Sequence, residues 1–291
     1  MKNVVFLCVP VEILSLYETL KRQNDLLSPV VKETITEIDI ASRRLLKNCQ
    51  NAILNSNIPG KHYKVFVKDT RLSRPINVEL FDIDLPSAHT ALYRRGDLSS
   101  LNKKEVARLL YTLYMSFCAA IDVSQSDNKK TPATFFEKFI GNIFAIELGV
   151  QPVTALPMLN EESLATDYIY QSAEGKAHIH LQVKLSTRER AIEAWAHQRI
   201  IDGIFGVDSY RGILVVGAET NLKKANMSVT DVCVPNQWGV YQKYIAKLHR
   251  IYYLDIPART ENLHAVPPYI QVKHLSEFFF EKDTVLQPPR G

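Results

Sequence analysis

The sequence predicts a mixed α/β protein in which helices flank a mixed β-sheet and the N-terminal half is largely helical. Three observations lead to this prediction. The first half contains long segments with apolar residues at three- and four-residue spacing, which is typical of amphipathic helices. The second half contains two runs, "TDYIYQ" and "AHIHLQVKLS", that alternate polar and apolar residues as strands do. The run "GILVVGAE" is continuously apolar and suits the centre of a sheet.

The elements of the first half follow from these patterns and from their breakers. Residues 57–86 contain Pro and Gly between short alternating runs, so they are predicted to form loops and strands. A polar stretch at 124–130 separates the last two helices, and Thr131 or Thr134 could cap the second of them. Helices are predicted at 11–23, 30–55, 101–123 and 131–149.

The second half is predicted to alternate strands and helices around one sheet. The two alternating runs are joined by "SAEGK" and are predicted to form a hairpin. A helix at 190–204 follows it and ends at glycines, and the apolar strand comes next. A helix at 239–250, a strand at 251–257 and a strand leading into a short helix at 269–280 complete the chain. Trp195 and Trp238 are expected in the core or at an interface.

Composition excludes some classes of protein and leaves others open. The 291 residues carry a net charge of only +4, which is a weak pointer to an anionic partner. The four cysteines show no metal-ligand spacing, and reduced thiols of a cytoplasmic protein are expected. We find no run that approaches the roughly 20 apolar residues of a membrane span, so no membrane partner is expected.

The hairpin carries a carboxylate and an amine that could meet at one lip of the sheet. Asp167 starts one predicted strand and Lys184 lies near the end of the next. A carboxylate beside an amine is the minimum for a Mg²⁺-dependent phosphodiesterase, because the acid binds a hard cation and the amine offsets charge on the phosphate. The same spacing also arises by chance in many proteins, so it allows a purely structural interpretation.

A charged triplet follows the lysine at the predicted start of the next helix. Arg188, Glu189 and Arg190 are chemically suited to reading neighbouring G·C pairs, because arginine binds guanine bidentately and a carboxylate accepts from cytosine. The alternative is a solvated helix face on which Arg190 pairs with Glu193.

Two further residues bear on a metal site. Glu137 could form a capping box with Thr134, or it could be an additional carboxylate beside the metal. Gln182 stands two residues before Lys184, at a place where most metal nucleases of this design have an acid. An amide cannot supply that charge, so a nuclease would need a carboxylate from elsewhere.

The stretch "TDYIY…HLQVKLSTRER" resembles the PD-(D/E)XK fold of type II restriction endonucleases. It is similar in particular to the subgroup that reads CCGG, CCNGG or CCWGG, which carries a lysine, three residues and Arg-Asp/Glu-Arg. The resemblance runs from 131 to 206. Lys184 with Arg188, Glu189 and Arg190 is its most specific part.

The resemblance implies a role for each matching residue. Asp167 and Lys184 would be catalytic with Glu137 as an accessory acid, and Arg188, Glu189 and Arg190 would contact DNA. The family also draws a glutamate from the next helix, where this chain has Gln198 and where Glu193 comes one turn early. The implied metal ligands are Asp167, Glu137 and Gln198.

The implied function is that of a Mg²⁺-dependent type II restriction endonuclease. It would cut double-stranded DNA at a palindrome containing CCGG and leave a 5′ overhang. A palindrome calls for a homodimer, and a cognate DNA methyltransferase is expected in the same cell. The chain would form one nuclease domain, 1–291, with a helical subdomain at 1–125 for dimerisation or DNA clamping and a catalytic core at 131–291.

Two other functions stay open at this point. The same basic junction would serve a sequence-specific DNA-binding protein without catalysis, or a structure-selective repair nuclease of the same fold. His178 and His180 could bind zinc, but no cysteine or third histidine is near them in sequence, so we expect them on a polar outer strand face.

Overall fold

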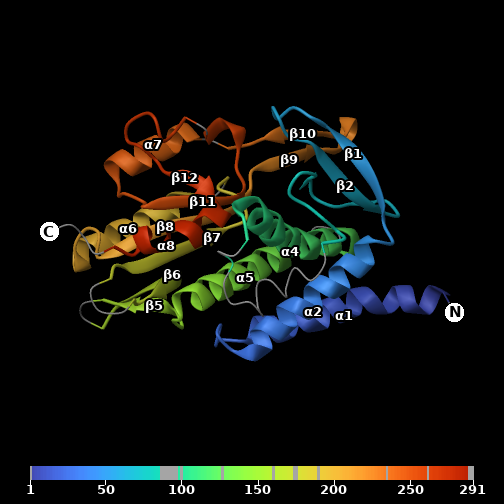
Figure 1. Cartoon of the computed structure of the whole chain (residues 1–291), viewed down its shortest axis with the longest axis horizontal. Coiled ribbons are helices and arrows are strands. Elements are labelled where there is room, and N and C mark those ends of the chain that lie inside the picture. The colour runs from blue at the N-terminus through green and yellow to red at the C-terminus, as the bar shows by residue number, and fades with distance from the viewer. Residues whose placement is uncertain are drawn as a thin grey trace. The chain divides into compact units, whose positions relative to one another are not determined.

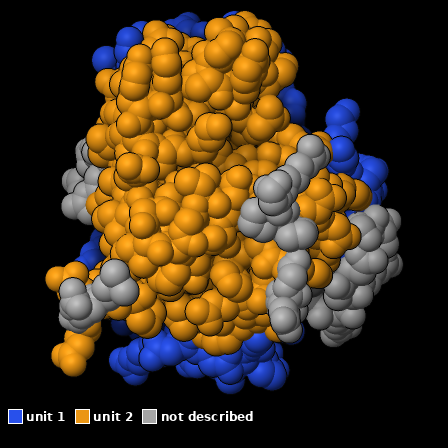
Figure 2. Space-filling model, turned by 90° about the vertical axis from the view of Figure 1, so that its left-hand side faces the viewer, with its two compact units in different colours: residues 1–142, 220–231 blue, residues 143–219, 232–291 orange. Residues whose placement is uncertain are grey.

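The computed structural model describes residues 2–85, 98, 101–125, 128–158, 161–172, 176–188, 191–233, 235–260 and 262–287. The chain divides into two compact units, coloured separately in Figure 2. Unit 1 comprises Met1–Asn142 and Thr220–Asp231, and unit 2 comprises Ile143–Glu219 and Val232–Gly291. The first change from one unit to the other thus falls inside helix α5 (Lys130–Leu148), whereas the predicted subdomains were separated by the polar stretch at 124–130.

Unit 1 combines helices with a sheet (Figure 1). Its helices are α1 (Lys2–Arg22), α2 (Pro29–Leu46), α4 (Lys103–Ser124) and the first part of α5 (Lys130–Leu148). Its strands are β1 (Gln50–Ser56), β2 (Tyr63–Lys68), β3 (Arg71–Leu72), β4 (Ile76–Asn77), β9 (Thr220–Lys223) and β10 (Ser228–Asp231). The sheet order is β3-β2-β1-β10-β9, with β4 also paired to β2.

The single helix predicted at 30–55 is wrong in its second half. The helix ends at Leu46, and residues Gln50–Ser56 form β1. This strand pairs antiparallel with β2 and parallel with β10, which comes about 170 residues later in the sequence. A partner that distant leaves no trace in the local periodicity of 30–55, so the helical pattern was extended too far.

Helix α4 forms part of the core of unit 1. A capping box between Asn102 and Glu105 starts it, and nearly every side chain from Val106 to Val123 is buried. By length and composition alone α4 is apolar enough to cross a membrane, but 89% of its apolar window is buried inside the protein. Burial among protein side chains satisfies its apolar surface instead.

Helix α5 begins earlier than either predicted cap. Its first residue is Lys130, and the Asn128 side chain accepts a hydrogen bond from Thr131 N at 3.1 Å. Thr134 therefore lies inside the helix, and the predicted capping box between Thr134 and Glu137 is wrong. An asparagine is as effective as threonine for satisfying the free N–H groups of a first turn.

Unit 2 contains the mixed sheet predicted from the sequence. Its strands are β5 (Val153–Pro157), β6 (Ser163–Tyr170), β7 (His178–Lys184), β8 (Tyr210–Ala218), β11 (Arg250–Asp255) and β12 (Val272–His274), in the order β12-β11-β8-β7-β6-β5. Strands β5, β6 and β7 are antiparallel, whereas β7, β8, β11 and β12 are parallel. The predicted hairpin is β6–β7, and the apolar strand β8 is central as expected.

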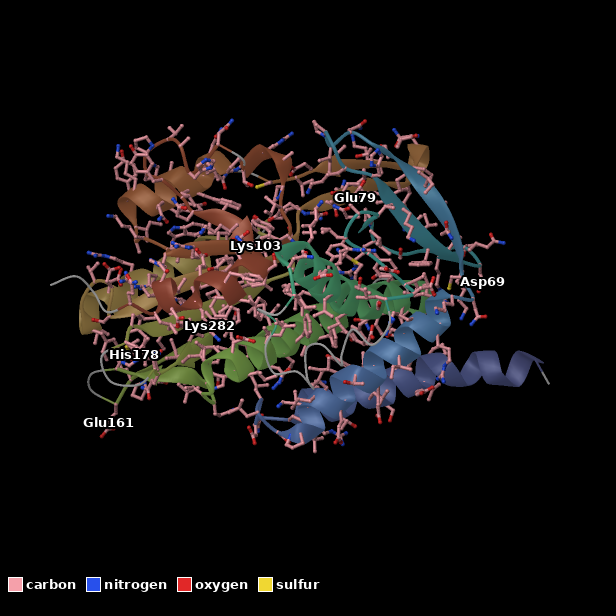
Figure 3. All side chains as sticks on the ribbon, in the orientation of Figure 1. Asp69, Glu79, Lys103, Glu161, His178 and Lys282 are labelled. Carbon is pink, nitrogen blue, oxygen red and sulfur yellow. The ribbon has the colours of Figure 1, made fainter. Side chains whose placement is uncertain are left out.

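Helices cover both faces of this sheet. Helices α6 (Ala191–Phe205) and α7 (Pro235–Tyr244) contribute Trp195 and Trp238, both fully buried, to a core cluster that includes β8 and β11 residues. Helix α8 (Phe278–Val285) packs on the opposite face, where Phe278 stacks on Phe144 and contacts Tyr252. Lys282 of α8, labelled in Figure 3, forms an ion pair with Glu147 at 3.0 Å.

Candidate active site

Asp167 and Lys184 lie close together at one end of the β6–β7 hairpin. Tyr168 pairs with Leu181 across the two strands, which brings the neighbouring Asp167 toward the lysine end of β7. The Lys184 Nζ atom lies 3.6 Å from Asp167 Oδ2, and the backbone N–H of Val183 donates to the same oxygen at 2.7 Å. The convergence of carboxylate and amine expected from the sequence is present in the structure.

A second carboxylate reaches the same lysine from helix α6. Glu193 lies in the first turn of α6, and its Oε2 atom is 3.1 Å from Lys184 Nζ. The ammonium therefore sits beside two carboxylates, from Asp167 and Glu193. The side chains of Lys184 and Asp167 are 20% and 21% exposed, so water only partly screens this cluster.

Burial is the main influence on the pKa of the Asp167 carboxyl. Desolvation raises the pKa of Asp167 above its ordinary value, and the negative charge of Glu193 acts in the same direction. The ammonium of Lys184 and the N–H of Val183 oppose this shift but do not cancel it. A cation bound at this carboxylate would favour its charged form, so the site is electrostatically suited to one.

Three polar residues of β7 face helix α6. His180, Gln182 and Lys184 alternate along the strand and so share one face. The Gln182 Nε2 atom donates to Thr166 Oγ1 at 2.6 Å and lies 3.3 Å from His197 Nδ1 on α6. The Gln182 Oε1 atom is buried and has no hydrogen-bond partner among the described residues.

His180 is fully buried, contrary to the expectation that it lies on a solvated strand face. Burial lowers its pKa to about 4, so its ring is neutral at pH 7. Its Nε2 atom lies 3.0 Å from Thr166 Oγ1, and its Nδ1 atom lies 3.0 Å from Gln198 Oε1. His178, at the first residue of β7 and labelled in Figure 3, accepts a hydrogen bond from Ser172 N instead. No cluster of three potential metal ligands surrounds either histidine within the described residues.

The partners of Gln198 fix the direction of these hydrogen bonds. Its Nε2 atom donates to Asp202 Oδ1 at 2.7 Å and to Tyr210 O at 2.9 Å. Its Oε1 atom must then accept from His180 Nδ1, and the neutral ring accepts at Nε2 from the Thr166 hydroxyl. A chain of oriented hydrogen bonds therefore runs from Gln182 through Thr166 and His180 to Gln198, whose side chain is buried and whose Oε1 atom already accepts from His180.

The comparisons with known proteins bear on this arrangement. No protein-family model and no curated protein matches the sequence. Among solved structures, the type IIP restriction endonuclease Kpn2I is similar with a TM-score of 0.81 and 24% identity. The likeness covers 94% of this chain and 96% of that one. This chain shares the fold of that endonuclease. The fold predicted from "TDYIY…HLQVKLSTRER" is thereby confirmed.

Within the restriction endonuclease fold, the cluster offers oxygen donors of the kind that Mg²⁺ prefers. Asp167 and Glu193 supply carboxylates, and the buried Gln182 Oε1 atom is an amide oxygen that lacks a hydrogen bond among the described residues. The donor chemistry therefore fits a hard divalent cation, with Lys184 supplying positive charge beside it.

The other residues predicted for the site lie on other segments or outside the described residues. Glu137 is partly buried in the middle of α5 and belongs to unit 1, whereas Asp167 and Lys184 belong to unit 2. Arg188 is exposed, and its backbone N–H donates to Ser186 Oγ at 3.3 Å. Glu189 and Arg190 lie outside the described residues.

Sequence reasoning missed two features of the site. It paired Glu193 with Arg190 or set it aside as one turn early, whereas Glu193 contacts Lys184. It also did not foresee that Thr166 links Gln182 to His180. The period-two pattern of "HIHLQVK" places the polar side chains on one face, which is the signal that could have indicated a shared network.

Proposed function

We propose that the chain is a Mg²⁺-dependent type II restriction endonuclease that makes sequence-specific double-strand cuts in DNA. The observation that carries the proposal is the cluster of Asp167, Lys184 and Glu193 on strands β6 and β7 and helix α6 of a restriction endonuclease fold. The two carboxylates supply acidic ligands for a metal ion, and the amine between them supplies positive charge. Phosphodiester hydrolysis needs both.

Each residue of the cluster has a part in the proposed reaction. When bound, a Mg²⁺ ion would polarise the scissile phosphate and lower the pKa of a water. Asp167 and Glu193 would hold the cation, and the Val183 N–H fixes the orientation of the Asp167 carboxylate. Lys184 would orient the attacking water and offset the negative charge that develops on the phosphate in the transition state.

The ligand set in this proposal departs in one place from what the resemblance implies. Gln198 Oε1 already accepts a hydrogen bond from His180, so we assign the second carboxylate to Glu193. Glu137 remains the accessory acid of the proposal. Gln182 is a candidate third ligand, because its buried Oε1 atom has no partner among the described residues.

DNA reading is assigned to the triplet Arg188, Glu189 and Arg190, on a palindrome containing CCGG. An exposed arginine four residues after the lysine suits contact with guanine in the major groove. Symmetric cutting with a 5′ overhang would require a homodimer with one site for each strand, and a cognate methyltransferase would protect the host DNA.

Plasmid digestion with Mg²⁺ tests the site directly. Asp167→Asn and Lys184→Ala should each slow cleavage by about 100-fold or more, because each removes charge at the phosphate. Lys282→Ala is the matched control, since Lys282 also pairs with a carboxylate in unit 2, at 3.0 Å from Glu147. The control should cut at the wild-type rate. Wild-type rates from the Asp167 and Lys184 variants would refute the assignment.

One observation favours a second function, a sequence-specific DNA-binding protein without catalysis. Gln182 stands where a carboxylate would strengthen metal binding. Tight and specific binding in a gel-shift assay, combined with no Mg²⁺-stimulated cleavage of the same duplex, would support this function and exclude the nuclease.

A further inference from the structure

A buried glutamate at the end of strand β8 holds the loop that follows the active-site lysine. Glu219 comes directly after β8 and is only 2% exposed. Its carboxylate accepts hydrogen bonds from Ser186 Oγ at 2.6 Å, from Thr187 N at 2.7 Å and from the Thr187 hydroxyl. The Tyr253 hydroxyl, on β11, donates to it at 3.2 Å.

Hydrogen bonds to the end of β8 hold all three residues between Lys184 and Arg188. Leu185 O accepts from Ala218 N at 3.1 Å, so the first linking residue is also tied to the end of β8. Glu219 holds the next two, Ser186 and Thr187. Arg188 is the first residue beyond this fixed segment, and its side chain is exposed.

We propose that Glu219 is a positioning residue for sequence discrimination. Glu219 holds Ser186 and Thr187 in place. It thereby sets the direction in which the chain leaves the sheet and the position of Arg188 relative to Lys184. Bidentate contact between an arginine and guanine tolerates only small displacements, so a rigid base for Arg188 favours the correct pair over others. This inference rests on the proposed function, because it assumes that Arg188 reads DNA.

The Glu219 carboxylate is suited to holding Ser186 and Thr187 in place for two physical reasons. Hydrogen bonds to a carboxylate are stronger than bonds between neutral groups, and four donors leave its two oxygens little freedom. The residue is buried behind the loop, so the carboxylate of Glu219 supports the segment without needing to contact DNA itself.

The test compares two glutamates of unit 2 that each accept several hydrogen bonds. Glu219→Gln removes the charge and replaces one accepting oxygen by a donor that faces other donors. Glu281→Gln is the matched control, because Glu281 accepts from Arg250, Lys273 and Tyr252 on the same sheet. Both variants should lower the melting temperature. Only the first should alter discrimination.

Discrimination is measured as the ratio of kcat/KM for the cognate duplex, found by mapping cut ends, to that for a duplex with one substituted base pair. Glu219→Gln should reduce this ratio about tenfold, within the range of one bidentate base contact. Glu281→Gln should leave it unchanged. An unchanged ratio in Glu219→Gln, or an equal fall in both variants, would overturn the inference.

Two smaller changes keep the test decisive if Glu219→Gln does not fold. Thr187→Val removes one donor to Glu219 and should reduce the ratio, whereas Tyr252→Phe removes a donor to the control carboxylate of Glu281 and should not. Equal discrimination ratios in these two variants would also overturn the inference about Glu219. A wild type that cuts without preference or not at all would instead refute the proposed function, and this inference with it.

Discussion

Gly212 on strand β8 makes room for the buried amide of Gln198, and replacing it tests the hydrogen-bond chain behind the active site. A Cβ atom at Gly212 would lie 2.5 Å from Gln198 Oε1 and 2.9 Å from Leu248 Cδ2. The leucine methyl is the end of a flexible side chain and can move. The amide is held by His180 and by Tyr210 O, so it cannot shift without breaking hydrogen bonds.

The expected cost of Gly212→Ala follows from these contacts. Inserting a methyl group into a packed interior costs about 1–3 kcal/mol. Leaving one buried hydrogen-bonding group of Gln198 or His180 without its partner costs about 1–3 kcal/mol more. We therefore expect Gly212→Ala to lower the free energy of unfolding by about 2–6 kcal/mol, the sum of these two ranges.

Urea unfolding followed by circular dichroism measures this change, with Gly203→Ala as the matched control. Gly203 lies in α6, and a Cβ atom there would meet nothing within 4 Å. Alanine is the better helix former, so Gly203→Ala should stabilise the protein by about 0.5–1 kcal/mol. The two glycine substitutions should thus have opposite signs.

A double-mutant cycle separates the clash from a general effect on β8. In a Gln198→Ala background the amide is gone, and Gly212→Ala should then cost much less than in the wild type. The reasoning fails if Gly212→Ala unfolds within about 0.5 kcal/mol of the wild type, which is the ordinary range of a neutral substitution, or if the background makes no difference.

Three other predictions concern the same face of the sheet. The pKa of His180 is about 4 in the folded chain and near 6.5 when unfolded, so the unfolded state takes up the proton first as the pH falls. As the pH falls from 6.5 to 4, this histidine should therefore lower the free energy of unfolding by about 1.4 kcal/mol per pH unit. In His180→Asn the pH dependence should weaken over that range, and it should match the wild type between pH 7.5 and 8.5. Gln182→Glu adds a carboxylate beside Asp167, so Mg²⁺ should raise its melting temperature more than that of the wild type, and an equal rise would exclude Gln182 from the metal site. Arg188→Ala should cost about 1–3 kcal/mol in discrimination at one G·C pair, and uniform weakening across all sequences would mean that Arg188 contacts only phosphates.

The central pair of the site was predictable because it depends on local structure. Asp167 and Lys184 lie on two strands of one hairpin, and the alternation of "TDYIYQ" and "HIHLQVK" sets which side chains share a face. Neither the turn nor the pairing needs information from distant parts of the chain. The position of β8 at the centre of its sheet followed in the same way from an unbroken apolar run.

The parts that could not be predicted depend on packing between distant elements. Alternation places His180 on a polar face, but it does not say that α6 covers that face and buries the ring. Local patterns likewise do not show that the first turn of α6 lies beside the end of β7, where Glu193 reaches Lys184. Strand β1 was missed for the same reason, since its parallel partner β10 is remote in sequence.

Sequencing the DNA ends that the purified protein produces from a genome of known sequence, with Mg²⁺ present, is the most direct test of the proposed function. A type II restriction endonuclease should produce 5′-phosphate ends that all fall at one fixed position in a single palindromic sequence, with none in reactions of Lys184→Ala. Ends scattered without a shared sequence, ends confined to branched or mismatched DNA, or ends that persist in the Lys184 variant would contradict it.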